Sequence, residues 1–471
     1  MHRTALLFLT TVALAACAHA SATAPAPASA PANAPAAANA YGYAYASTYS
    51  PLPSRPTLIR NATVLTAAGP LLERASVLLR DGKVEAVGTE VEAPADAVVI
   101  DGTGKWVTPG LIDAHSHLGV YPAPGGEALS DGNESTAPNT AEVWAEHSIF
   151  PQDPQFALAL AGGVTSLQIL PGSANLFGGR TVTVKNVPAT TAQAMKFPGA
   201  PYGLKMACGE NPKRVYGGRG RAPSTRMGSM AAYRQAWIRA DRYRREWQRW
   251  RENGGDPAKQ PQRDLQLETL AGALAGDILV HHHCYTAPEM ADVLAMAREF
   301  GYRVATFEHA VEAYKIRDLL AKEGVCANMW ADWWGFKIEA YDAIDENAAL
   351  VHQAGGCAVI HSDSPEGIQR LNQEAAKAMA AGIHGGIPLD RAEVIRWITI
   401  NPARAIGIDR WTGSLEPGKM ADVVIWSGDP FSVYSRAEKV FIDGALVYDR
   451  GDPRLQPRSD FVLGNQREVL P

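Results

Sequence analysis

Short runs of apolar and β-branched residues, separated by tight turns, mark both ends of the chain. At the N-terminal end the runs cover residues 57–66, 75–79 and 83–87, and at the C-terminal end they cover residues 422–426, 439–442 and 445–448. Asp-Gly pairs, which favour hairpin turns, stand between two neighbouring runs at each end. The pattern predicts strands, and we expect residues 56–106 and 412–455 to combine into one small β-sandwich.

The middle of the chain alternates between short apolar runs that stop at polar residues and longer helical stretches, such as residues 287–300 and 310–323. This alternation predicts parallel strands joined by crossover helices. The length of the region suits an α/β fold of the (β/α)8 type, a TIM barrel, which we place at residues 107–411. A doubly wound sheet is the alternative, but no glycine-rich phosphate loop follows an early strand.

One long helical pattern, residues 230–252, interrupts the alternation. Its aromatic residues, among them Tyr233, Trp237 and Tyr243, follow one stripe, and arginines fill the positions between them. We expect the stripe to pack on the protein body and the arginines to face water, in preference to a partner-binding face. The helix is part of an insertion at about residues 206–265, after the fourth strand of the barrel.

Histidines stand at the ends of several apolar runs in the middle region. Residues 107–114 lead to His115 and His117, and residues 278–280 lead to three consecutive histidines that end at His283. Side chains two residues apart on a strand share a face, so His115 and His117 can point into one site. Of the three consecutive histidines, the first and third share a face, and we choose His283 because it is nearest the strand end.

Three further residues complete the pattern. Residues 304–308 lead to His309, residues 357–361 lead to Asp363, and residues 201–204 lead to Lys205. The spacings fit barrel strands four, five, six and eight, whose C-terminal ends carry the active site in enzymes of this fold. His361, two residues before Asp363, is expected to support a ligand rather than to bind a metal itself.

Two segments resemble motifs of a known family. Residues 109–117, PGLIDAHSH, are similar to the opening motif of the amidohydrolase superfamily, and residues 413–422, GSLEPGKMAD, are similar to its closing signature. The likeness is greatest to the branch of imidazolonepropionase-like and metal-dependent peptidase-like enzymes. It covers about residues 57–450 and implies a TIM barrel with an attached β-sandwich.

The resemblance also implies a centre for one or two divalent metal ions, with Zn²⁺ expected. The implied ligands are His115, His117, Lys205, His283, His309 and Asp363. Lys205 aligns with a lysine that is carboxylated in many relatives and bridges two metals, although Glu210 is an alternative source of the carboxylate. Neutral imidazoles suit zinc, and an open position on such an ion lowers the pKa of bound water to near 7.

Asp363 is the implied general acid/base, since a carboxylate beside the water can take its proton and pass it to a leaving nitrogen. The expected substrate is a small amide, a cyclic amide or a dipeptide. A lactonase or esterase with the same centre, and a binding protein without turnover on the same fold, stay open at this stage.

Charge and cysteine content narrow the function classes. The formal net charge is −5 over 471 residues with both signs interspersed, which argues against nucleic acid as a partner. Cys208, Cys284, Cys326 and Cys357 are far apart and form no CxxC pair, so we expect buried thiols rather than a disulfide framework. Whether the chain self-associates stays open.

The first residues resemble an export signal. Residues 1–17 have a weakly basic start and a short apolar stretch, and residues 14–17, LAAC, resemble a bacterial lipobox; cleavage after residues 18–20, AHA, is the alternative. Residues 18–55, rich in Ala and Pro, are expected to form a disordered tether. We therefore expect an exported protein, periplasmic or an outer-membrane lipoprotein, that contacts the membrane only through a lipid on Cys17.

Overall fold

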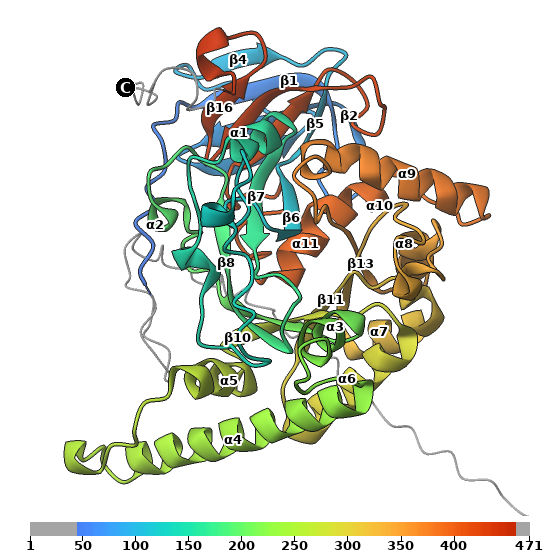
Figure 1. Cartoon of the computed structure of the whole chain (residues 1–471). Helices are drawn as coiled ribbons and strands as arrows, with labels where there is room; N and C mark the ends of the chain where they lie inside the picture. Colours follow the sequence, from blue (N-terminus) through green and yellow to red (C-terminus); the bar gives the residue numbers. More distant parts are fainter. Residues whose placement is uncertain (1–44, 458–471) are drawn as a thin grey trace, which may run out of the picture.

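Residues 45–457 are described by a computed structural model, in which an eight-stranded barrel sheet adjoins a second eight-stranded sheet (Figure 1). The signal peptide, the lipobox and residues 18–44 of the predicted tether lie outside the described residues. Within residues 45–457, no helix combines the length and apolar character that crossing a membrane requires.

The second sheet takes strands from both ends of the chain, as the apolar runs predict. Its strands are β1 (Thr57–Val64), β2 (Leu72–Arg80), β3 (Lys83–Gly88), β4 (Val98–Asp101), β5 (Trp106–Pro109), β14 (Val423–Trp426), β15 (Ala437–Ile442) and β16 (Ala445–Asp449). These strands are joined by continuous hydrogen bonding, in which β1 pairs with β2, β4 and β5. Apolar residues such as Ile59, Val77 and Phe441 form a core cluster of this part.

The barrel carries the predicted site. Its strands are β6 (Leu111–Ser116), β7 (Val164–Ile169), β8 (Phe177–Lys185), β9 (Tyr202–Ala207), β10 (Ile278–His283), β11 (Val304–Glu308), β12 (Cys326–Met329) and β13 (Cys357–Ile360), hydrogen-bonded in that order. The strands with Lys205, His283 and His309 are the fourth, fifth and sixth, as the spacing predicts. Between β13 and β6, the Asp363 N–H donates to the His115 carbonyl at 3.3 Å.

One strand departs from the all-parallel barrel. β8 pairs antiparallel with both β7 and β9. Only a short loop joins β7 to β8, and two strands connected in this way must run in opposite directions, because a parallel neighbour needs a long crossover. The barrel therefore keeps eight strands while replacing one βα unit by a hairpin.

Helices cover the outside of the barrel (Figure 1). They are α1 (Pro154–Ala161), α2 (Ala192–Met195), α5 (Leu265–Ala275), α6 (Ala287–Phe300), α7 (Arg317–Glu323), α8 (Asn347–Gln353), α9 (Leu371–His384), α10 (Arg391–Val394) and α11 (Ile400–Ala405). The predicted helix at 287–300 is confirmed as α6. The one at 310–323 is shorter, a 3-10 turn followed by α7, because residues 310–312 continue the loop that leaves β11.

The insertion after the fourth strand contains α3 (Glu210–Gly217) and the long α4 (Arg226–Glu252). On α4, Tyr233, Trp237 and Tyr243 are buried, as the aromatic stripe predicts. Figure 1 shows α4 lying across one end of the molecule beside α5, with its C-terminal part reaching past α5. Contacts between α4 and α5 hold this insertion on the barrel.

Residues 45–55, which the composition placed in the tether, contact the protein body. The Ser47 hydroxyl donates to the Lys196 carbonyl at 2.7 Å, and the Lys196 ammonium donates to the Tyr45 carbonyl at 2.6 Å. The Tyr49 hydroxyl bonds the carboxylate of Asp443 in the second sheet. Tyrosines supply the anchoring that the Ala- and Pro-rich composition lacks, so the predicted disorder does not extend to these residues.

The prediction of free buried thiols is wrong. Cys208 and Cys284 form one disulfide, and Cys326 and Cys357 form another. Cys326 and Cys357 are register partners on the neighbouring strands β12 and β13, and Cys208 and Cys284 directly follow the neighbouring strands β9 and β10. Parallel strands bring residues together that are a whole βα unit apart in the sequence, which is why spacing along the chain hid both pairs.

Candidate metal centre

The C-terminal ends of five barrel strands bring the six predicted residues together. His115, Lys205 and His283 lie within β6, β9 and β10. The other three, His117, His309 and Asp363, lie just beyond the ends of β6, β11 and β13. The ring centroids are 5.1 Å apart for His115 and His117, 4.5 Å for His115 and His309, and 4.8 Å for His283 and His309. The residues predicted from separate runs therefore share one site.

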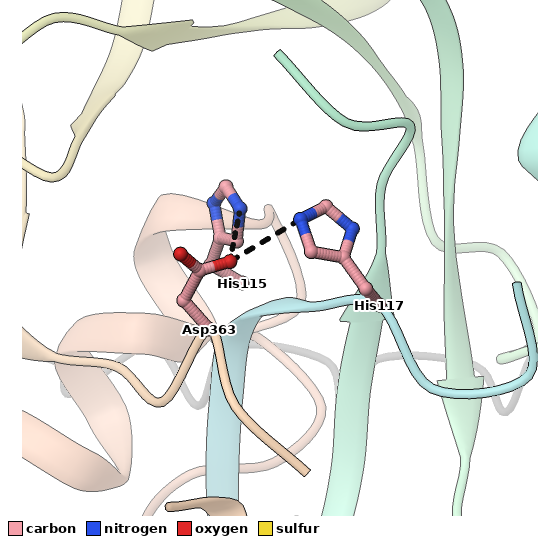
Figure 2. A group of neighbouring side chains, drawn as sticks. All are labelled: His115, His117 and Asp363. Atoms are coloured by element: carbon pink, nitrogen blue, oxygen red, sulfur yellow. Dashed lines mark ion pairs between the residues drawn. The ribbon is translucent and has the colours of Figure 1, made fainter. Parts of the chain in front are cut away.

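Three residues form the tightest group. Ligand atoms of His115, His117 and Asp363 all lie within 4.8 Å of one another. Asp363 Oδ1 lies 3.2 Å from Nε2 of His117 and 3.6 Å from Nε2 of His115 (Figure 2). Two imidazole nitrogens and a carboxylate oxygen at this spacing suit a small divalent cation such as zinc.

The four histidines share one orientation, in which Nδ1 contacts a neighbouring group. The partners of Nδ1 are Glu308 Oε2 for His115 at 2.9 Å, the Leu170 carbonyl for His117 at 2.8 Å, Ser173 Oγ for His283 at 2.8 Å and His361 Nε2 for His309 at 3.2 Å. Nε2 of His283 is buried and has no hydrogen-bond partner within residues 45–457. Contacts of this kind fix the ring and leave Nε2 for a metal, so the residues present fit a bound cation.

Lys205 is buried beside the tight group, with Nζ 3.3 Å from His115 Nε2. Burial lowers the pKa of the Lys205 ammonium to about 8. A lysine that loses its proton this readily presents a neutral amine, the form that reacts with carbon dioxide. Glu210, the alternative, stands in the first turn of α3 and not in the group around Asp363. The geometry favours Lys205 at the centre.

Electrostatics prepare these groups for a cation. Burial, helped by the charge of Lys205, holds the pKa values of His115, His283 and His309 well below the usual range, so the imidazoles are neutral. Burial alone would raise the pKa of Asp363, but the hydrogen bond with His117 and its positive neighbours outweigh burial and lower it. The site therefore offers neutral nitrogens and a carboxylate, which are the metal-binding forms.

Two of the strand-end residues have an uncommon backbone. His309 has φ of 58° and Asp363 has φ of 51°, in the left-handed region that non-glycine residues seldom adopt. Such conformations persist only where the surrounding structure enforces them, and they cluster at functional sites. The turn directs both side chains toward the centre just beyond the ends of their strands.

Glu308 and Asp113 support the site, although the sequence did not single them out. Glu308 is buried and bridges two histidines, with Oε2 on His115 and Oε1 3.1 Å from Nδ1 of His281. Asp113 accepts the N–H of His115 at 3.1 Å and bonds the Ser362 hydroxyl, and burial raises its pKa to about 7. Glu308 directly precedes His309, and Asp113 stands two residues before His115. A carboxylate this close to a predicted ligand was the signal available in the sequence.

The protein is an α/β barrel with an attached sheet built from both chain ends. Histidines, a lysine and an aspartate gather at the C-terminal ends of the barrel strands, and these features define a class of barrel proteins with a candidate metal centre. The amidohydrolase family profile matches residues 338–450. A crystal structure of an amidohydrolase from Thermotoga maritima is 36% identical, covers 84% of this chain and all of its own (100%), and has a TM-score of 0.77. The chain belongs to the amidohydrolase superfamily.

Curated relatives agree with this family. "Amidohydrolase tasK" of Hapsidospora irregularis is 33% identical over 435 residues, which are 84% of this chain and 43% of that protein. An imidazolonepropionase of Chromobacterium violaceum is 34% identical over 146 residues, 26% of this chain and 35% of that protein. The chain thus spans less than half the length of these two curated relatives.

Proposed function

We propose that the chain is a metal-dependent hydrolase that cleaves a C–N bond of a small amide, a cyclic amide or a dipeptide. One observation carries the proposal: four histidines at the ends of the three strands β6, β10 and β11 each fix Nδ1 on a neighbour, and they gather around Asp363 and Lys205. Gathering four imidazoles, a carboxylate and an amine inside a barrel costs desolvation free energy that stability of the fold does not require, which favours a functional role. The amidohydrolase and imidazolonepropionase names of the relatives support the bond type.

In this proposal His115, His117 and Asp363 hold one divalent ion, and His283 and His309 hold a second if Lys205 is carboxylated between them. Zinc is the expected ion because the donors are mainly neutral imidazoles. The chemistry that such an ion supplies when bound is activation of water at neutral pH and polarisation of a carbonyl. A measurement of the metal content per chain distinguishes one bound ion from two.

Asp363 is proposed to move the proton. Its lowered pKa keeps it a carboxylate at neutral pH, and it lies among His115, His117 and His309. From there it can accept a proton from the attacking water and deliver it to the leaving nitrogen, which makes the amine a good leaving group. Glu308 and His361 hold the rings of His115 and His309 and take no part in the proton transfer.

The test combines metal analysis with a substrate panel on the wild-type protein and Asp363→Asn. We expect zinc in the wild type, hydrolysis of at least one amide, cyclic amide or dipeptide, and loss of that activity after chelation. Asp363→Asn should retain at least one equivalent of metal, through the histidines, and lose turnover by at least about 100-fold. Activity on esters or lactones alone, or full activity of Asp363→Asn, would contradict the proposal.

We also propose that the chain is exported and lipidated at Cys17. The leader and the LAAC sequence support this, and so do the two disulfides, which persist in oxidising compartments. Cell fractionation in a Gram-negative host should place the full chain in the membrane fraction and a Cys17→Ser variant in the soluble periplasm. Cytoplasmic location of the full chain would refute export.

A further inference from the structure

The loop that follows β12 builds an aromatic wall on the candidate metal centre. The Trp330 ring stacks on His309, with centroids 4.4 Å apart and planes at 14°, and Trp333 stacks on Trp330 at 4.8 Å. Tyr285 lies 5.7 Å from His309, and Phe336 meets Trp330 edge-on at 5.5 Å. The exposed fraction rises outward, from 9% for Trp330 to 38% for Trp333 and 54% for Phe336. The wall runs from a predicted ligand to the surface.

Lys337 stands in this wall as a largely buried cation. Its Nζ lies 3.8 Å from the centroid of the Tyr285 ring, and its side chain is 15% exposed. Its ammonium contacts two oxygens, Asn211 Oδ1 at 3.5 Å and Glu339 Oε2 at 3.8 Å. Charge-assisted hydrogen bonds are normally 2.7–2.9 Å long, so neither contact satisfies the three donors of an ammonium.

Glu339 is shared between Lys337 and Arg226, and its Oε2, which faces Lys337 at 3.8 Å, lies beyond hydrogen-bond distance of the ammonium. Its Oε1 accepts a hydrogen bond from the Arg226 guanidinium at 2.8 Å, and the same arginine also pairs with Glu289 at 2.8 Å. Because two carboxylates hold the Arg226 guanidinium, it is not free to bind a substrate anion through two parallel hydrogen bonds. Lys337, in contrast, has only the two long contacts with Asn211 and Glu339 among the described residues, and it stands beside an aromatic face.

Lys337 lies beside the candidate centre through the ring of Tyr285. The centroid of that ring is 3.8 Å from Lys337 Nζ, 4.9 Å from the His283 ring and 5.7 Å from the His309 ring. Burial lowers the pKa of Lys337, which a bound carboxylate would counteract. Because the Tyr285 ring contacts the ammonium and lies beside two predicted ligands, one small molecule can touch both Lys337 and the centre.

We propose that Lys337 binds a carboxylate of the substrate, while Trp330, Trp333 and Tyr285 contact an apolar group beside that carboxylate. The inference rests on the proposed C–N hydrolysis and narrows its substrates to amides that carry a free carboxylate next to an aromatic or aliphatic side chain. Lysine recognises the anion as a point charge, and the indole and phenol faces exclude water around it. Neutral cyclic amides are then poor substrates.

The kinetic test compares Lys337→Met with the wild type in the full, zinc-loaded protein. The probes are the dipeptide Gly-Phe and its C-terminal amide. For Gly-Phe the variant should raise KM by about 10-fold or more with a smaller change in kcat, because a charge-assisted contact is lost. For the amide, wild type and variant should have equal and high KM values. Lys322→Met, on an exposed position of α7, is the matched control and should behave as wild type.

A binding measurement separates failure of this inference from failure of the proposed function. Calorimetric titration with N-acetyl-L-phenylalanine and with its amide needs no turnover. Tighter binding of the acid than of the amide to the wild type, reduced by about 10-fold in Lys337→Met, supports the inference even if no tested C–N bond is cleaved. Equal affinities of wild type and variant for the acid, or no binding of the acid to the wild type, would overturn it.

Discussion

At the scale of single residues, the orientation of His115 depends on a carboxylate that binds no metal in the proposal. Glu308 accepts from Nδ1 of His115 and from Nδ1 of His281, and Asn328 donates to it at 2.6 Å. A carboxylate in this position fixes the tautomer and raises the basicity of the ligand nitrogen. The site is therefore built from two layers of side chains, and the outer layer can be tested separately.

Glu308→Gln should weaken zinc binding by about 10- to 100-fold, the usual effect of removing an outer carboxylate. The amide keeps the shape of the side chain but accepts only a weaker hydrogen bond. Competition with a chromophoric chelator measures the affinity, and Glu323→Gln on the outer helix α7 is the control. Unchanged zinc affinity in Glu308→Gln would show that His115 does not depend on this contact.

The six site residues could be predicted from the sequence because each stands at or just beyond the end of an apolar run and because the motifs fix their order. Glu308 could not be predicted in the same way. Strand alternation allows only one of two adjacent residues to face the barrel interior, yet both Glu308 and His309 reach the centre. The positive φ of His309 makes this possible, and nothing in the local sequence signals that turn.

At the scale of secondary structure, the local sequence pattern predicts features that depend on a single helix or strand. It does not predict features that depend on which two strands become neighbours. Six of the eight strands of the second sheet and helix α6 follow directly from apolar periodicity, whereas β4 was not predicted and β5 takes residues 107–109, which were assigned to the barrel. The antiparallel β8 and the two disulfides depend on which strands become neighbours, so periodicity along the chain carries no trace of them. The aromatic stripe of α4 lies within a single helix, so it could be predicted from the sequence.

Adjacent residues on α4 allow that stripe to be tested. Trp237 is fully buried and its ring stacks on Tyr302 at 4.5 Å, whereas Ile238 is 59% exposed. Trp237→Ala should lower the free energy of unfolding by about 3–5 kcal/mol through the cavity that it leaves, and Ile238→Ala by less than about 1 kcal/mol. Denaturant titration followed by circular dichroism measures both. Similar losses for the two variants would mean that α4 does not pack on the body through this stripe.

At the scale of the whole molecule, the barrel and the second sheet are tied together by a buried cluster of charges. Lys185, at the end of β8, donates to Asp422 at 3.1 Å and to Asp443 at 2.8 Å, and all three side chains are at least nine-tenths buried. Asp422 closes the motif GSLEPGKMAD, and it also accepts from the Thr412 hydroxyl at 2.7 Å. The last residue of the family signature thus has a structural purpose, since it anchors the returning chain to the barrel.

Removing the Lys185 ammonium should therefore weaken the attachment of the second sheet to the barrel and lower the free energy of unfolding. Lys185→Met leaves Asp422 and Asp443 buried without a counter-charge, and breaking a buried pair in this way costs about 3–5 kcal/mol. Lys105→Met removes a partly exposed pair with Glu438, 2.6 Å long, and should cost no more than about 1 kcal/mol. Denaturant unfolding followed by tryptophan fluorescence compares the two, and zinc content reports whether the barrel survives. If Lys185→Met is as mild as Lys105→Met, the second sheet is held on the barrel by apolar contacts alone, and the closing signature needs another explanation.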